Sequence, residues 1–362
     1  MSDRSDLLRG LLKDVSRSFY LTLRVLPRPI RPQMGLAYLL ARAADSIADT
    51  DLLAPAERIE KLRLFKQALL SRNPELIDSI QDSLDAMRGK KFVTESSAEE
   101  ALLRRLPECF RMFLTMTSDD AARIVEVLKE LIGGMELDLH RFPADGVLRS
   151  LETFDELEQY TYSAAGCVGL FWTRMCCAHL PAFQPWHVKM DHMQMLGVSF
   201  GKALQWTNVL RDLPRDLAQG RCYLPARDLR DAGVAPYQLR DATQYPRVEG
   251  LYHHYLNHTL EHYRAAWEYT ISIPKEARRV RLACIWPIWI GLETLAALRV
   301  ASNPLDARFR IKISRERVYG IMLRSFFTAG SETMLDEHQH WLVKAAQGVS
   351  SLVRTKKIRF FE

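Results

Sequence analysis

Two aspartates, one helical turn apart, are the first residues of this chain whose type and spacing could carry chemistry. Asp45 and Asp49 lie in the stretch AADSIADT, which is otherwise mostly apolar. Residues four apart on a helix share one face, so the two carboxylates converge on a small volume and repel each other. A cation between them would remove that repulsion. The stretch therefore predicts a helix that presents a pair of metal ligands.

A second polar row lies in QWTNVLRDLPRDLAQGRCYLP. Asn208, Asp212 and Asp216 follow at steps of four, and Gln205 precedes them by one turn. Magnesium takes a few carboxylates together with water and phosphate oxygens, so two such rows could clamp magnesium ions. Pro214 lies inside this row and predicts a kink at the end of the helix.

Arginines accompany both rows. Arg42, Arg211 and Arg221 each lie within five residues of one of the aspartates. A single D-x-x-x-D is most often a solvated helix face. Two copies in apolar helices, each beside arginines that can hold phosphate oxygens in a forked geometry, favour a diphosphate site.

Composition sets the class of protein. The chain has 362 residues, 48% of them hydrophobic, and 50 Lys and Arg against 44 Asp and Glu give a net charge of +6. This mild excess suits anionic small molecules or an anionic membrane, and the dispersed basic residues disfavour a nucleic-acid partner. Six cysteines without a CxxC pair and an N-terminus without an apolar signal core predict a cytoplasmic protein with reduced thiols.

Helical periodicity dominates the chain, strand signals are nearly absent, and no linker marks a boundary. We expect a single all-α domain over residues 1–362. The apolar stretch Leu282–Leu298 contains Pro287 and Glu293, is short for a membrane span, and predicts a buried helix. The basic tail, residues 353–362, is either a solvated end or a peripheral membrane contact. Helices are expected at Leu7–Leu26, Met34–Ile47, Ala56–Leu70, Leu102–Met116, Ala121–Leu139, Leu157–Leu180, Val188–Leu213, Tyr252–Ile271, Val280–Val300, Val318–Phe327 and Met334–Val353.

With these motifs the chain resembles the squalene and phytoene synthase family, the head-to-head branch of the prenyl transferases. SRSFYL, YLLARAADSIAD, YTYSAAGCVG and NVLRDLPRDLAQGRCYLP are similar to four family segments and occur in the family's order. The resemblance implies an all-α isoprenoid-synthase bundle around a central apolar cavity. It also implies two molecules of farnesyl diphosphate as substrates, joined through presqualene diphosphate.

The resemblance implies a role for each matching residue. Tyr160 would act as acid/base and stabilise cations, and Tyr38 would be a second active-site tyrosine; Asp45 and Asp212 would take part in catalysis. The magnesium ligands would be Asp45, Asp49, Asn208, Asp212 and Asp216. The substrate would be bound by Ser16, Arg17, Ser18, Phe19, Arg42, Gln205, Arg211 and Arg221.

Other interpretations of these residues remain open. A tyrosine on an apolar helix often packs its ring and turns its hydroxyl to the nearest partner. Ser16, Arg17 and Ser18 could be ordinary helix surface, and Phe19 a core contact. Gly166 and Gly169 could serve close helix packing, prenyl-chain binding or both.

The family resemblance leaves the product open. Squalene synthases finish with a hydride from NADPH, whereas dehydrosqualene and phytoene synthases only lose a proton. No G-x-G-x-x-G follows a strand, so NADPH would bind the helical bundle itself. IKISRER places Lys312 and Arg315 where two basic residues of the reducing members fall, although Ser314 replaces an arginine; Lys90, Lys91 and Phe92 fall near a loop that covers the cofactor.

We therefore predict a squalene synthase, most similar to the bacterial enzymes, with Mg²⁺ and NADPH as cofactors. Three alternatives stay open: a synthase that does not reduce its product, a longer C20 substrate, and an inactive member that serves as an interaction protein. A di-iron bundle would need two E-x-x-H pairs, and the sequence has one, Glu337 to His340.

Overall fold

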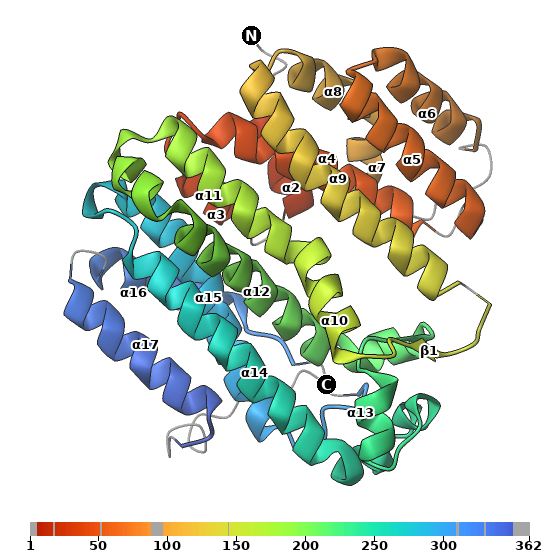
Figure 1. Cartoon of the computed structure of the whole chain (residues 1–362), viewed down its shortest axis with the longest axis vertical. Coiled ribbons are helices and arrows are strands. Elements are labelled where there is room, and N and C mark those ends of the chain that lie inside the picture. The colour runs from red at the N-terminus through yellow and green to blue at the C-terminus, as the bar shows by residue number, and fades with distance from the viewer. Residues whose placement is uncertain are drawn as a thin grey trace. The chain divides into compact units, whose positions relative to one another are not determined.

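The computed structural model describes residues 6–16, 19–50, 53–87, 97–143, 145–308, 311–328 and 331–349. The described chain is almost entirely helical, as predicted (Figure 1). It divides into two compact units: residues 1–143 with 171–181, and residues 144–170 with 182–362. The single domain expected from the sequence stays a prediction.

The first unit is built around α4, which packs against α5, α8 and α9 (Figure 1). Pro32 lies in the first turn of α4, where its missing N–H costs no hydrogen bond, and the helix ends where Thr50 becomes extended. The described elements of this unit are η1 (Leu7–Leu11), α2 (Leu12–Ser16), α3 (Phe19–Val25), α4 (Arg31–Asp49), α5 (Pro55–Ser71), α6 (Pro74–Met87), α7 (Ser97–Arg104), α8 (Leu106–Leu114) and α9 (Ser118–Arg141).

The second unit is built around α12, α14 and α15, which pack on one another. The helices α11 (Cys167–His179) and η3 (Pro181–Lys189) carry residues of both units. The other described elements are β1 (Arg149–Ser150), α10 (Phe154–Thr161), η2 (Tyr162–Gly166), α12 (Met190–Ala218), β2 (Arg221–Cys222), α13 (Ala226–Asp231), η4 (Pro236–Arg240), η5 (Ala242–Gln244), α14 (Tyr245–Ile271), η6 (Lys275–Ala277), α15 (Arg278–Val300), α16 (Arg315–Thr328) and α17 (Glu332–Ala346).

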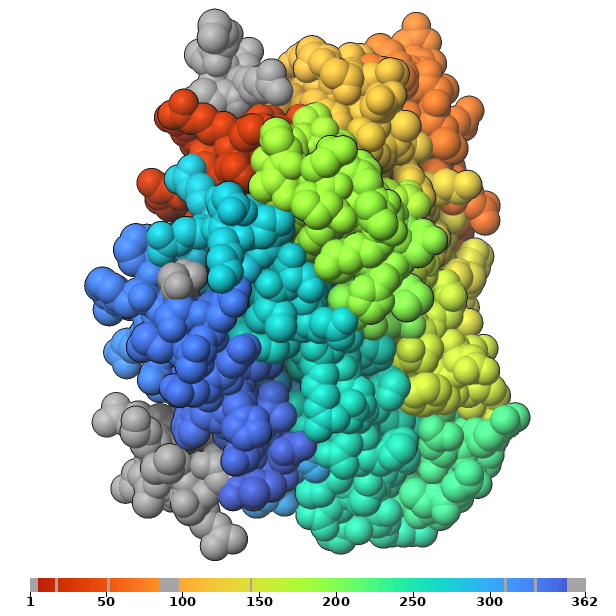
Figure 2. All heavy atoms as spheres, turned by 60° about the vertical axis from the view of Figure 1, so that its left-hand side comes forward, coloured from red at the N-terminus to blue at the C-terminus, as the bar shows by residue number. Residues whose placement is uncertain are grey.

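The apolar helix α15 lies inside the second unit, in contact with α12, α14, α16 and α17. It is long and apolar enough to cross a membrane, but 83% of its most apolar window is buried in the protein. A helix that is hydrophobic all round belongs in a core, so α15 fits the prediction of a buried helix. Figure 2 shows residues of α14 and α17, in cyan and blue, at the surface of this unit.

Glycines let α12 approach the segment that precedes it. A Cβ at Gly169 would lie 1.8 Å from the carbonyl oxygen of Gly197, and one at Gly201 would lie 2.1 Å from that of Ala165. No side chain fits at such distances, so backbone meets backbone here. Gly169 therefore serves close helix packing, which is one of the two roles considered for it.

Candidate active site

The aspartates of the first unit lie at the end of α4. Asp45 forms an ion pair with Arg42, one turn earlier on the same helix, and 37% of its side chain is exposed. Partial burial and the like charge of Asp49 raise the pKa of Asp45 to about 6, against the opposing effect of Arg42. A divalent cation would relieve the repulsion between these two carboxylates. Their oxygen atoms are ligands that magnesium accepts, so the pair fits a magnesium ion.

Arg42 is held by two carboxylates. Its guanidinium pairs with Asp45 and with Glu99 on α7. Burial alone would lower the pKa of Arg42, but the two carboxylates outweigh that effect and raise it. Glu99 was not predicted as a partner of Arg42, because Glu99 lies in another helix and no local pattern links that helix to α4.

The predicted substrate residues at the start of the chain have other contacts. Ser16 is buried and donates to the carbonyl oxygen of Leu12. Phe19 and Tyr38 stack with their ring centroids 5.5 Å apart, and the Tyr38 hydroxyl lies 3.5 Å from the carbonyl oxygen of Val15. Arg17 and Ser18 lie outside the described residues, as do Lys90, Lys91 and Phe92.

The second row lies on one continuous helix. The sequence predicted a helix that ends at Leu213, but α12 continues through Pro214 to Ala218. The kink at Pro214 stays a prediction. A proline cannot donate to the carbonyl four residues earlier, which is that of Leu210. The Tyr252 hydroxyl of α14 donates to this oxygen at 3.1 Å. Residues at steps of four along α12 therefore share one face as far as Asp216.

Arginine and aspartate also pair within this row. The Arg211 Nε donates to Asp212 Oδ1 at 2.8 Å, and a second guanidinium nitrogen binds Oδ2. Burial would lower the pKa of Arg211, but Asp212 outweighs it and raises the pKa. Arg221 lies on β2, which pairs in parallel with β1. The arginine stays charged and adjacent to the carboxylate, as a site for magnesium and diphosphate requires.

The candidate catalytic tyrosine joins this row through hydrogen bonds. Gln205 Nε2 donates to the Tyr160 hydroxyl at 3.1 Å, and its Oε1 accepts from Asn208 Nδ2 at 3.3 Å. The Tyr160 ring stacks on Tyr223, with centroids 4.3 Å apart and planes 21° from parallel. Tyr223 is 5% exposed and was not predicted as a site residue, although it lies in the last quoted motif. A single aromatic outside a helix or strand gives no sequence pattern that reveals its stacking partner.

Of the predicted cofactor residues, Arg315 is the first residue of α16, and Lys312 precedes the helix by three residues. Lys312 and Arg315 are exposed and form no ion pair with the described residues. Arg317, in contrast, pairs with Glu293 at 2.6 Å. Ser314, which replaces the expected arginine, accepts a hydrogen bond from the Arg317 N–H at 3.2 Å and so caps the helix. Two exposed cations at the start of a helix fit a phosphate.

The chain matches a known protein family over most of its length. The squalene/phytoene synthase family matches residues 12–317. The chain belongs to the squalene/phytoene synthase family. It is thus a member of the head-to-head prenyl synthases, as the resemblance implied.

Individual relatives carry phytoene synthase names. Over 313 residues the chain is 30% identical to a bifunctional lycopene cyclase/phytoene synthase of Pyrenophora tritici-repentis, which covers 85% of this chain and 47% of that protein. It is 29% identical over 328 residues to the phytoene synthase of Mycobacterium tuberculosis, covering 89% and 91%. The chain spans less than half the length of the bifunctional relatives it matches.

The fold is shared with solved structures. TcSQS in complex with the ligand E5700 aligns with a TM-score of 0.70 at 18% identity, covering 96% of this chain and 98% of that one. This likeness shows the helical isoprenoid-synthase fold.

Proposed function

We propose that this protein is a squalene synthase, which condenses two farnesyl diphosphates head to head and reduces the product. The two aspartate rows, each with an arginine paired to an aspartate, are the observation that carries the proposal. Loss of diphosphate from one substrate gives an allylic cation. Attack by the double bond of the second and loss of a proton give presqualene diphosphate, and a second ionisation with hydride transfer gives squalene.

The chain's own residues would divide this work. Magnesium ions held by Asp45, Asp49, Asn208, Asp212 and Asp216 would stabilise the leaving diphosphate. Arg42 in the first unit, and Arg211 in the second, would exchange their aspartate partners for diphosphate oxygens. Arg221 of the second unit would also bind diphosphate oxygens. The Tyr160 hydroxyl, oriented by Gln205 and by the stacked Tyr223 ring, would take up or return the proton.

The reductive step is supported by the beginning of α16. Lys312 and Arg315 would hold a phosphate of NADPH, which supplies the hydride. The phytoene synthase names of the relatives favour the alternative, a synthase that releases an unreduced product from C15 or C20 diphosphates. The two candidates differ in whether turnover requires NADPH.

Incubation of the purified chain with farnesyl diphosphate and Mg²⁺, with and without NADPH, tests the proposal. Squalene formed only with NADPH would support it, and Lys312→Ala with Arg315→Ala should then raise KM for NADPH. Dehydrosqualene in both tubes would reject the reduction. No product from farnesyl or geranylgeranyl diphosphate would favour the inactive interaction protein. Asp212→Asn should abolish turnover, while Asp155→Asn, an exposed aspartate on α10, should not.

We also propose that the protein is cytoplasmic and attaches peripherally to a membrane. The basic tail that suggested this contact lies outside the described residues, but α16 adds support. Tyr319, Leu323, Phe326 and Phe327 recur at helical spacing on α16 and are 61% to 76% exposed. Such an apolar face flanked by Arg315 and Arg324 is typical of helices that lie in a membrane interface.

Sedimentation with anionic vesicles tests the attachment. Phe326→Ser with Phe327→Ser should release the protein to the supernatant. Val188→Ser, which removes a 95% exposed apolar side chain in η3, should leave binding unchanged. Equal sedimentation of both variants would reject α16 as the contact.

A further inference from the structure

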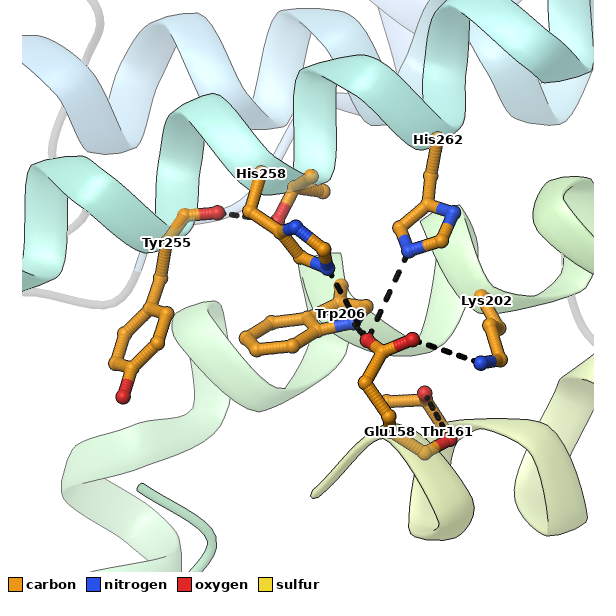
Figure 3. Close-up of polar contacts among 8 residues, drawn as sticks. Glu158, Thr161, Lys202, Trp206, Tyr255, His258 and His262 are labelled. Carbon is orange, nitrogen blue, oxygen red and sulfur yellow. Dashed lines mark hydrogen bonds and ion pairs between the residues drawn. The ribbon is translucent and has the colours of Figure 1, made fainter. Parts of the chain in front are cut away.

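A carboxylate of α10 faces two histidines of α14 within the second unit (Figure 3). Glu158 Oε1 lies 3.1 Å from His258 Nε2 and 3.7 Å from His262 Nε2. The three candidate ligand atoms all lie within 4.8 Å of one another. The two histidines are four residues apart, so both rings leave the same face of the helix.

The two separations from the carboxylate oxygen are close to those in a metal site. Bonds of about 2.0–2.2 Å from zinc to nitrogen and oxygen place neighbouring ligand atoms about 3.3 Å apart in a tetrahedral site. The observed 3.1 Å and 3.7 Å bracket that value. Two imidazoles and one carboxylate, with a position left for water, form a ligand set that zinc and related divalent ions accept.

Two further donors bind the carboxylate (Figure 3). Trp206 Nε1 donates to Glu158 Oε1 at 2.7 Å, and Lys202 Nζ donates to Oε2 at 2.8 Å. These two contacts hold Glu158 in one orientation, as a metal ligand requires.

His262 presents a buried nitrogen to this cluster. Among the described residues, its Nε2 atom has no hydrogen-bond partner. Buried polar atoms are nearly always satisfied, and 3.7 Å is too long for a hydrogen bond to Glu158. An open groove of about 490 Å³ reaches this histidine; it is lined by Leu170, Asp191, Gln194, Met195, Val198, Ser199, Lys202 and His262.

We propose that Glu158, His258 and His262 bind one divalent cation of the zinc class. This site differs in chemistry from the aspartate rows, whose oxygen ligands suit magnesium. The ion would tie α10 to α14. Because Glu158 lies two residues before Tyr160 on α10, the same tie would steady the candidate catalytic tyrosine.

Titration of the metal-free full-length chain with Co²⁺, in a large excess of Mg²⁺, tests the proposal. Magnesium occupies oxygen-rich sites and leaves the nitrogen-containing site to cobalt. We expect one equivalent of bound Co²⁺ with the intense visible bands of a four- or five-coordinate ion, displaced by Zn²⁺, and a higher Tm with Zn²⁺.

Substitutions test whether the bound metal ion is held by these residues. His262→Gln and His258→Gln should each weaken Zn²⁺ binding by about 100-fold or more, since even outer contacts of a metal are worth roughly 10- to 100-fold. His192→Gln removes a histidine that also pairs with a glutamate, Glu268 at 3.0 Å, and should bind Zn²⁺ as the unaltered chain does. Circular dichroism of each metal-free variant checks that it folds.

Two results would overturn the proposal. One is a lack of saturable Co²⁺ or Zn²⁺ binding by the unaltered chain. The other is binding that survives in folded His262→Gln but disappears in Asp212→Asn, which would assign the ion to the aspartate row. Neither result depends on prenyl diphosphate turnover.

Discussion

The Tyr252 hydroxyl donates a hydrogen bond to the backbone carbonyl of Leu210 at 3.1 Å. Pro214 stands four residues after Leu210 and has no N–H to offer it. A buried carbonyl without a partner costs about 1–3 kcal/mol, so this one hydroxyl makes a proline tolerable inside α12. Asp212 and Asp216 remain on one helical face as a result.

Removing that hydroxyl should therefore destabilise the protein. We expect Tyr252→Phe to lower the free energy of unfolding by about 1–3 kcal/mol, measured by urea denaturation. In a Pro214→Ala background the alanine N–H can serve Leu210, so the same substitution should cost less. Equal costs in both backgrounds would contradict this account. Tyr237→Phe, at a 67% exposed tyrosine, is the control.

Gly169 should not accept a side chain. A Cβ there would lie 1.8 Å from the Gly197 oxygen, which is backbone and cannot turn aside. We expect Gly169→Ala to lower Tm by several degrees or to prevent folding. Gly250→Ala, on α14 with no atom within 4 Å of the new Cβ, should instead stabilise by up to about 1 kcal/mol, because alanine favours helix. Thermal scans of both variants decide whether close packing is responsible.

Metal binding at the first row should depend on pH. Since the pKa of Asp45 is about 6, a proton competes with the cation below that pH and not above it. Apparent affinity for Mn²⁺, followed by electron paramagnetic resonance with Mg²⁺ as competitor, should fall about tenfold from pH 7 to pH 5. Asp45→Asn should bind weakly at both values and lack this step. A wild-type midpoint near pH 4 would show that Asp45 is unperturbed.

The sequence predicted the helical class and most long helices because their periodicity is local. It missed α6, since Asn73–Pro74 indicated a break. Pro74 does follow a break, but it is also the first residue of α6, where a proline needs no N–H partner. The helix predicted for α12 also ended too early, at Leu213. The hydroxyl that compensates for Pro214 comes from Tyr252 on α14, and no pattern within α12 indicates it.

The residues of the candidate site were likewise predictable only where the signal lies within one helix. Spacing along one helix was enough to single out Asp45 with Asp49, and Asp212 with Asp216. Partners from other elements, such as Glu99 beside Arg42, could not be read from the sequence. Such pairs form only when two helices pack, and a single sequence holds no signal for them.

The packing of His338 gives the protein a predicted sensitivity to acid. The side chain lies on α17, with its ring 4.3 Å from Trp289 and 5.7 Å from Trp341 between centroids. Burial, and then the positive charges of Arg324 and Arg317, lower its pKa to about 4 from an ordinary value of 6.5. Between these pH values the unfolded chain binds a proton that the folded chain refuses, so stability falls as pH falls.

Replacing His338 should remove that slope. Between pH 7 and pH 4, the lowered pKa of His338 costs the unaltered chain about 3 kcal/mol of unfolding free energy. His338→Gln has no such group and should not show this loss. The difference in unfolding free energy between the unaltered chain and His338→Gln should shrink by that amount as pH falls. His340→Gln, an exposed histidine on the same helix, should differ from the unaltered chain by a constant amount. Parallel curves for His338→Gln and the unaltered chain would mean that His338 takes up its proton in the folded state as easily as in the unfolded one.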